Sequence, residues 1–182
     1  MIHLKKNQSG VTLIEVVVVI ALLGILAGFA YPNFKSWIPN YKLKAAARDL
    51  VSNFQRAKME AVKRNKWVVV SFTPGTYSSS GMVGSYQIFV DDGTGGGTAR
   101  NFTRDGSELI ITQIIMPKYV TLYAASFSGG TTAAGFDGKG LPASSRIGNV
   151  KLRNNNSRYY KVTLSIEGNI NVQKSNDGTN WQ

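Results

Sequence analysis

The chain has 182 residues, 21 of them basic and 10 acidic, so its formal net charge is +11. This length allows one domain with a hydrophobic core plus an appended helix, and the charge favours anionic partners such as nucleic acid, lipid headgroups or acidic protein surfaces. The absence of cysteine excludes disulfides, and the single histidine, His3, lies in an N-terminal leader that we expect to be removed. Ser-His-Asp triads, Cys-His pairs and common zinc sites are therefore excluded from the remaining chain.

A short basic leader precedes the most apolar segment of the chain. Residues 1–10 contain Lys5 and Lys6, and residues 11–31 form an apolar run that holds one acidic residue, Glu15. As a helix this run would be about 31 Å long, which is close to the thickness of the hydrocarbon core of a bilayer. Because basic residues before a membrane span stay on the cytoplasmic side, we expect the rest of the chain to lie in the periplasm or outside the cell.

Glu15 distinguishes between three interpretations of this segment. A charged side chain within hydrocarbon costs roughly 2.5–3.5 kcal/mol, so a carboxylate there indicates a function. An ordinary secretory signal peptide is one alternative, with Gly28-Phe29-Ala30 as its cleavage site, and an uncut membrane anchor is another. The apolar part of a signal peptide seldom holds a Glu, and a plain anchor does not need one. The pattern therefore disfavours both alternatives and favours the third interpretation, a segment in which the carboxylate has a function.

The sequence Gly10-Val11-Thr12-Leu13-Ile14-Glu15 resembles the N-terminus of type IV pilin-like proteins. That family has a basic leader ending in Gly, a Glu at the fifth mature position and then an apolar helix. The resemblance implies cleavage between Gly10 and Val11 by a prepilin peptidase, followed by N-methylation of Val11. It also implies that Glu15 pairs with the Val11 ammonium of a neighbouring subunit, which removes two unpaired buried charges together. Val11 departs from the family, in which Phe is commoner at this position.

The apolar run ends at a proline. Pro32 has no backbone N–H and would clash with the carbonyl of Gly28, so we expect the helix to be interrupted after Tyr31. Gly24 and Gly28 weaken the same stretch and have the spacing of a close-packing helix motif. The resemblance implies that Pro32 marks the place where the helix bends or locally melts during filament packing. We therefore predict that Glu15, Gly24, Gly28 and Pro32 serve assembly.

Residues 41–66 have the periodicity of an amphipathic helix. One apolar stripe recurs at alternating spacings of four and three: Leu43, Ala47, Leu50, Phe54, Ala57 and Ala61. The basic residues of this segment lie largely off the stripe: Lys42, Lys44, Arg48, Arg56, Lys58, Lys63, Arg64 and Lys66. The stripe predicts a helix that lies on a sheet, and its other face is unusually one-sided in charge.

After residue 66 the sequence period changes to that of β-strands. Short segments rich in β-branched and aromatic residues are bounded by Gly, Asn, Asp, Ser or Pro: 67–73, 86–90, 109–116, 119–124, 150–152, 159–166 and 170–173. Glu167-Gly168-Asn169 predicts a tight turn between the last two. The predicted fold class is α+β, with a long N-terminal helix packed on a C-terminal antiparallel β-sheet domain.

The order of these elements narrows the resemblance. One long helix followed only by strands, together with residues 45–50 and 55–65, is similar to the GspH/FimT branch, which comprises minor pilins and minor pseudopilins of type II secretion. We therefore divide the chain into a leader (1–10), a transmembrane and assembly helix (11–40) and a periplasmic or extracellular pilin-like domain (41–182). In that domain we expect a helix over 41–66 and β-sheet over 67–182.

Two pairs of acidic residues remain as formal candidates for catalysis. Asp91/Asp92 and Asp105/Glu108 both lie in Gly-rich or polar stretches, where solvated acids are the ordinary finding. Residues 91–97 predict a flexible hairpin loop, and their acids lack the spaced series of oxygen ligands that a calcium cage needs. We therefore predict no catalytic, cofactor or metal site.

Two functions remain open at this stage. One is a structural subunit of a type IV pilus or type II secretion pseudopilus, held in the bacterial inner membrane before assembly with other pilins. The other is a minor pilin that captures DNA during uptake, because basic residues supply phosphate contacts. The candidate anion contacts are Lys58, Lys63, Arg64, Lys66, Lys151, Arg153, Arg158 and Lys161. Against DNA binding, Asn169 and Asn171 stand where the DNA-linked members of the family have arginine.

Overall fold

The computed structural model describes the backbone of residues 10–182 and the side chains of these residues except 29–36. The leader up to residue 9 lies outside the described residues, as do the side chains of Tyr31 and Pro32. The chain divides into two units, Met1–Trp37 and Ile38–Gln182, and each is described here by itself.

One helix, α1 (Leu13–Arg64), accounts for all of the helical sequence apart from a short 3₁₀ turn. The expected interruption after Tyr31 is wrong, because the backbone stays helical through Pro32. A proline removes only one hydrogen bond from the helical ladder, and the turns on either side keep theirs. Among the described residues, no helical stretch is both long and apolar enough to cross a membrane. The expected span over 11–31 runs into residues whose side chains are not described.

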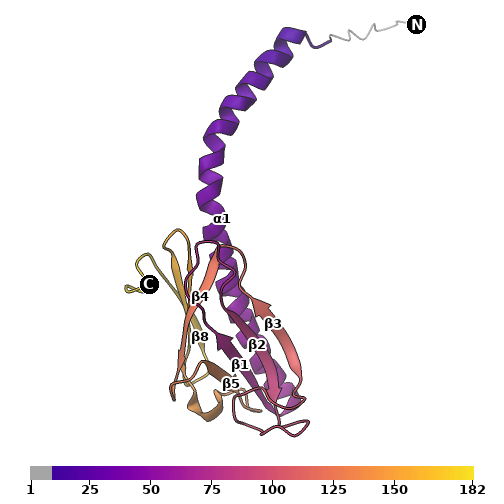
Figure 1. Cartoon of the computed structure of the whole chain (residues 1–182), viewed down its shortest axis with the longest axis vertical. Coiled ribbons are helices and arrows are strands. Elements are labelled where there is room, and N and C mark those ends of the chain that lie inside the picture. The colour runs from indigo at the N-terminus through magenta and orange to yellow at the C-terminus, as the bar shows by residue number, and fades with distance from the viewer. Residues whose placement is uncertain (1–9) are drawn as a thin grey trace, which may run out of the picture. The chain divides into compact units, whose positions relative to one another are not determined.

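Residues 67–182 form two four-stranded antiparallel sheets (Figure 1). The first has the order β3-β2-β1-β5 and consists of β1 (Trp67–Thr73), β2 (Ser85–Asp91), β3 (Ile110–Ile115) and β5 (Ala133–Phe136). The second has the order β4-β6-β7-β8 and consists of β4 (Val120–Phe127), β6 (Gly148–Asn154), β7 (Tyr159–Leu164) and β8 (Ile170–Ser175). A 3₁₀ turn, η1, covers Ala143–Ser145. The predicted fold class is confirmed, with two sheets instead of one.

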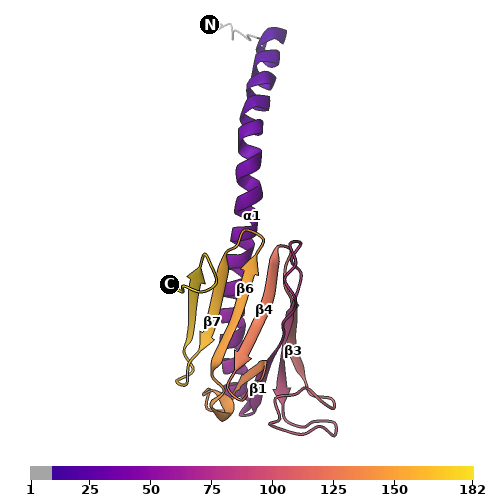
Figure 2. The ribbon, with the colours of Figure 1, turned by 60° about the vertical axis from the view of Figure 1, so that its left-hand side comes forward.

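The apolar stripe of α1 forms the centre of the core. All six residues of the stripe are buried, and they cluster with inward-facing residues of both sheets, such as Val70 of β1 and Leu152 of β6. Phe54 contacts the rings of Phe72 and Phe136, at centroid distances of 5.8 and 6.4 Å. Figure 2 shows this part of α1 behind the strands of both sheets. The helix thus covers the inner faces of both sheets, as the stripe predicts.

Strand β5 is the element that the sequence did not predict. Its residues, Ala133-Ala134-Gly135-Phe136, include no β-branched side chain, although all four are buried. A Cβ on Gly135 would lie only 2.7 Å from the carbonyl oxygen of Val68 in the neighbouring strand β1. The close approach of the two backbones therefore requires glycine, at the expense of the usual strand composition.

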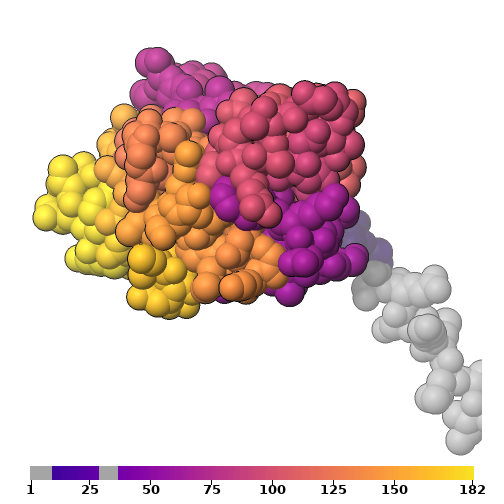
Figure 3. Space-filling model, turned by 90° about the horizontal axis from the view of Figure 1, so that it is seen from below, coloured from indigo at the N-terminus to yellow at the C-terminus, as the bar shows by residue number. Residues whose placement is uncertain are grey.

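A second, smaller cluster lies on the face of the first sheet that α1 does not cover. It contains Val69, Phe89 and Phe102, with Trp67 packed against it. The loop after β2 supplies Phe102, whose ring meets that of Trp67 at 5.3 Å, and the guanidinium of Arg146 lies 3.6 Å from the Phe102 ring centroid. Figure 3 shows this loop in crimson and the segment around η1 in orange, next to the purple end of α1.

Candidate functional site

The N-terminus of α1 is capped by its own sequence. The side-chain Oγ1 of Thr12 accepts a hydrogen bond from the backbone N–H of Glu15 (3.3 Å), and the carbonyl of Thr12 accepts one from Val16 N–H (3.2 Å). Thr12 is therefore the N-cap, and Glu15 lies in the first turn, where an acidic side chain interacts favourably with the helix dipole. The spacing Thr-x-x-Glu is the sequence signal of a capping box, which the sequence analysis did not use.

The apolar segment at the start of α1 is exposed along its described length. Every residue from Gly10 to Gly28 is exposed, and exposure reaches 83% for Leu13. A Cβ added to Gly24 or Gly28 would meet no atom within 4 Å. Contacts within this chain therefore give no reason for glycine at these two positions, and any packing need must come from outside the molecule. The proposed roles of Gly10, Val11 and Pro32 are not tested by these observations.

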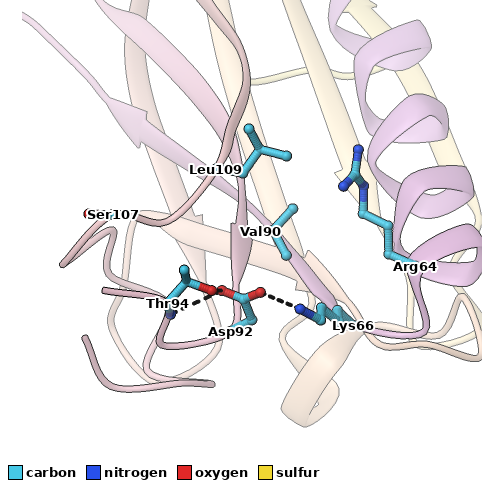
Figure 4. A pocket seen from close by; sticks show the side chains of 7 residues that line it. All are labelled: Arg64, Lys66, Val90, Asp92, Thr94, Ser107 and Leu109. Carbon is cyan, nitrogen blue, oxygen red and sulfur yellow. Dashed lines mark hydrogen bonds and ion pairs between the residues drawn. The ribbon is translucent and has the colours of Figure 1, made fainter. Parts of the chain in front are cut away.

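The basic residues near the end of α1 do not form a free patch. Arg64 Nε donates to Glu60 Oε2 at 2.7 Å, and Lys66 Nζ donates to Asp92 Oδ2 at 2.5 Å. The Lys66 bond, together with Thr94, holds the pKa of the Asp92 carboxyl at about 2. Figure 4 shows these two cations at the rim of a depression of about 280 Å³, whose other lining residues include Val90 and Leu109.

Lys58 and Lys63 differ from this pair. Lys58 Nζ reaches across to the last hairpin and donates to the carbonyl of Gly168 at 3.4 Å. Lys63 is exposed, and no ion pair in the described part of the chain includes it. Lys58 thus positions the hairpin turn at Glu167-Gly168-Asn169, which joins β7 and β8 as predicted.

The outer face of the second sheet gathers three of the predicted basic residues. Lys151 and Lys161 are register partners on β6 and β7, and Arg153 is the register partner of Tyr159. The inward neighbours Val150, Leu152 and Val162 are buried, so these cations point away from α1. The fourth, Arg158, lies in the β6–β7 turn, where its Nη1 donates to Asn176 Oδ1. The structure therefore brings Lys151, Arg153 and Lys161 together and separates them from Arg158.

Aromatic rings line this outer face. Both lysines lie over the Trp181 ring, with Nζ at 5.7 Å for Lys151 and 4.7 Å for Lys161. The guanidinium of Arg153 lies 3.7 Å from the Tyr77 ring centroid and 5.2 Å from that of Tyr159. Arg153 Nε is buried without a hydrogen-bond partner. Tyr77 and Trp181 lie in loops, where no strand periodicity could have indicated their orientation.

One acid of each acidic pair is buried, which corrects the expectation that these acids are solvated. Asp91 is buried and accepts hydrogen bonds from the backbone N–H groups of Arg100 (2.5 Å) and Phe102 (2.8 Å). Glu108 is also buried and accepts from the N–H groups of Gly93 (2.9 Å) and Asp105 (3.2 Å). These carboxylates hold the loop after β2 in place. The part of the chain that the structure describes contains no group of three acidic, His or Cys side chains suited to a metal.

Two family models match the chain. Residues 46–168 match the model described as Type II transport protein GspH, and residues 5–31 match the model described as Prokaryotic N-terminal methylation motif. Similar proteins include Pilin-like protein PilA1 of Thermus thermophilus, which is 38% identical over 87 residues, covering 47% of this chain and 49% of PilA1. A fimbrial protein of Pseudomonas aeruginosa is 36% identical over 69 residues, covering 38% of this chain and 44% of that protein. The chain thus spans about half the length of the curated relatives it matches.

Among solved structures, the chain is similar to the type IV minor pilin FimU of Pseudomonas aeruginosa. In one crystal form the TM-score is 0.49 at 14% sequence identity, and the match covers 73% of this chain and 89% of the FimU chain. In a second crystal form the TM-score is 0.46 at 16% identity, covering 71% of this chain and 91% of the other.

Proposed function

Because the chain belongs to the GspH family, we propose that it is a minor pilin or pseudopilin, a structural and non-enzymatic subunit of a type IV pilus or a type II secretion pseudopilus. The match to the N-terminal methylation motif supports the same assignment. The apolar half of α1 is the assembly element of this subunit, and the sheet domain is displayed on the filament surface.

The exposure of the whole apolar segment before Gly28 carries this proposal. Apart from Glu15, this helix is apolar on all sides and exposed over residues 13–28, and such a helix is stable only in lipid or among other apolar helices. Before assembly the segment lies in the inner membrane as a single pass, with the domain in the periplasm. A prepilin peptidase cleaves after Gly10, and the new N-terminus at Val11 is methylated.

Glu15 then sets the register between subunits. Inside a bundle of apolar helices its carboxylate needs a partner, and the Val11 ammonium of a neighbouring subunit supplies one. The helix dipole offers Glu15 a second role, because its carboxylate lies in the first turn of α1, next to the N-cap Thr12. The two roles are separable, because only the first requires the Glu15 carboxylate to contact a neighbouring subunit.

Filament incorporation of two matched variants tests this assignment. Glu15→Ala should still be inserted and cleaved, because a more apolar span inserts more easily, but it should be lost from filaments. Thr12→Ala removes the N-cap oxygen and keeps the carboxylate, so it should be incorporated nearly normally. If Glu15→Ala enters the filament at the wild-type level, the register role of Glu15 within the shaft is wrong, and only a subunit at the tip, which has no neighbour above it, remains compatible. Equal losses in both variants would assign Glu15 to capping.

DNA capture is the second candidate, and the outer face of the second sheet favours it. Lys151, Arg153 and Lys161 form a basic strip with aromatic neighbours, which is the chemistry that binds single-stranded nucleic acid. The rings are already covered by cations, which leaves phosphate contacts as the main source of affinity. Binding of the detergent-solubilised chain to a DNA oligonucleotide should then fall steeply with salt. It should fall further in Lys151→Glu/Lys161→Glu, with Lys139→Glu/Lys174→Glu, at exposed lysines outside the candidate contacts, as the control of equal charge.

A further inference from the structure

Three segments of the domain Ile38–Gln182 meet near its first residues. The side-chain oxygen of Asn40, Oδ1, accepts hydrogen bonds from Asn154 Nδ2 (2.8 Å) and Asn156 Nδ2 (3.3 Å) in the β6–β7 turn. The Nζ of Lys42 lies 5.6 Å from the ring centroid of Tyr119, just before β4. Figure 2 shows the β6–β7 turn beside α1 at this end. We call the surface formed by residues 40–44, 117–119 and 154–158, with the loop 78–82, the N-terminal pole of the domain.

The loop 78–82 belongs to this pole through its backbone. Gly81 forms a β-bridge with Lys118, and Met82 N–H donates to the carbonyl of Pro117 at 3.2 Å. Met82 is 62% exposed, in a left-handed conformation with φ of 59°. A large apolar side chain is thus presented to the outside beside Lys118.

The N-terminal pole is basic and lacks acidic residues. Its segments contain Lys42, Lys44, Lys118 and Arg158, and no Asp or Glu. Asp49 follows the segment 40–44 along α1, and Asp177 follows Asn176, the hydrogen-bond partner of Arg158. The Asp177 carboxylate accepts a hydrogen bond from the Ser175 hydroxyl at 2.7 Å. In the described part of the chain the ion pairs join Arg64 to Glu60 and Lys66 to Asp92, so none of them neutralises the pole.

Two of these cations approach the same aromatic ring. The Nζ atoms of Lys42 and Lys118 lie 5.6 and 5.1 Å from the Tyr119 ring centroid. The ring attracts both ammonium groups, and no ion pair in the described part of the chain includes either lysine. An anion that bound beside the ring would interact favourably with both.

The position of the pole in the chain identifies the anion. Residue 38 is separated from the proposed membrane segment, residues 11–31, only by residues 32–37, so the chain connection keeps the pole near the level of the lipid headgroups. Lysines, an exposed tyrosine (Tyr41, 61%) and an exposed methionine are the side chains that suit this layer. We propose that the N-terminal pole binds anionic phospholipid headgroups while the subunit waits in the membrane. This inference rests on the proposed function and goes beyond it.

Binding of the pole to the headgroups would give the domain a defined orientation before filament assembly. Each lysine near an anionic surface strengthens binding about fivefold at low salt. Contacts from Lys42, Lys44 and Lys118 would hold the domain against the bilayer, and extraction into a filament would release them.

The test uses the full chain in vesicles of phosphatidylcholine, with or without about a third of phosphatidylglycerol. Since the chain has no cysteine, Met82→Cys offers one site for an environment-sensitive fluorophore. We expect a blue-shifted emission only in the anionic vesicles, which is lost in high salt and in Lys42→Glu/Lys44→Glu/Lys118→Glu. The control Arg56→Glu/Lys139→Glu/Lys174→Glu changes the net charge equally at exposed basic residues elsewhere and should keep the shift.

Flotation of the same vesicles separates this inference from the proposed function. All variants should float with the lipid, because the apolar helix inserts irrespective of the pole. Equal emission in neutral and anionic vesicles, while all variants still float, would contradict lipid binding by the pole and would leave the proposed membrane insertion unaffected. Failure of the wild-type chain to float would overturn membrane insertion and the pole's role together. If the triple pole variant loses binding to a DNA oligonucleotide and its emission on vesicles is unchanged, the pole belongs to nucleic acid instead.

Discussion

Buried carboxylates explain how a long Gly-rich loop keeps a defined path. Asp91 and Glu108 stand at its two ends and accept hydrogen bonds from the backbone N–H groups of the loop itself. Hydrogen bonds to a charged acceptor are stronger than those between neutral groups, and they compensate for burial of the charge. The sequence identified these acids as pairs and placed them in water, because spacing along the chain does not reveal which backbone groups surround them.

The ion pair between Lys66 and Asp92 should make stability depend on pH. The pKa of Asp92 falls from 3.8 to about 2 in the folded chain, mainly because Lys66 donates to it. A lowered pKa means that the stabilisation is present above the unfolded value, near 3.8, and is lost as the pH falls through about 2. Lys66 is 52% exposed, so the contribution is at most about 1 kcal/mol.

Thermal unfolding of Asp92→Asn measures this contribution. At pH 7 the variant should melt a few degrees below the wild-type chain, and the difference should disappear near pH 2. A difference that persists unchanged at pH 2 would mean that the carboxylate charge is not its cause. Asp49→Asn, on the exposed face of α1, is the control and should behave like the wild type throughout.

At the scale of secondary-structure elements, prediction from the sequence was most accurate where one hydrophobic period extends over many residues. The stripe from Leu43 to Ala61 predicted which face of α1 is buried, because a helix that must cover two sheets needs an apolar residue at every turn. Strand β5 was not predicted, since its small residues serve a close backbone approach to β1. The break expected at Pro32 was wrong, because local propensity is a weak guide inside a long helix.

The core stripe also sets the free energy of unfolding of the domain. Leu50 is fully buried among residues of the helix and both sheets, and no nearby loop can move in to fill its space. Leu50→Ala should therefore lower the free energy of unfolding by about 2–5 kcal/mol. Val62→Ala, at a position that is 51% exposed on the same helix, should change it by less than about 1 kcal/mol. Chemical denaturation of both variants gives the comparison, and a similar loss in each would contradict the described core.

The candidate site shows the same division between periodic and non-periodic sequence. Lys151, Arg153 and Lys161 alternate with buried residues along their strands, so their shared face followed from period two. Tyr159 lies on that face, whereas Tyr160 packs against the core. The aromatic partners Tyr77 and Trp181, and the pairing of Lys66 with Asp92, depend on tertiary contacts between distant segments, which a single sequence does not encode locally.

At the scale of the whole molecule, the chain combines a domain that buries its own core with an apolar segment that is exposed. The unit Ile38–Gln182 has its own core, whereas the apolar segment before it is exposed along its length. A fragment that starts near Pro39 should therefore be a folded, soluble monomer, because the stripe can still cover both sheets. Its melting temperature should be the same with and without reductant, since no disulfide exists. Sedimentation and circular dichroism test this expectation, and an unfolded or aggregated fragment would show that the core needs the preceding segment.

The central claim is that the chain is cleaved after Gly10 and enters a filament through its apolar helix. The most direct measurement is the intact mass of this protein in the filament fraction sheared from its native cells. The account predicts a chain that has lost residues 1–10 and gained one methyl group on Val11. A chain in that fraction cleaved after Ala30, or its presence only as the uncut form in the membrane, would contradict the account.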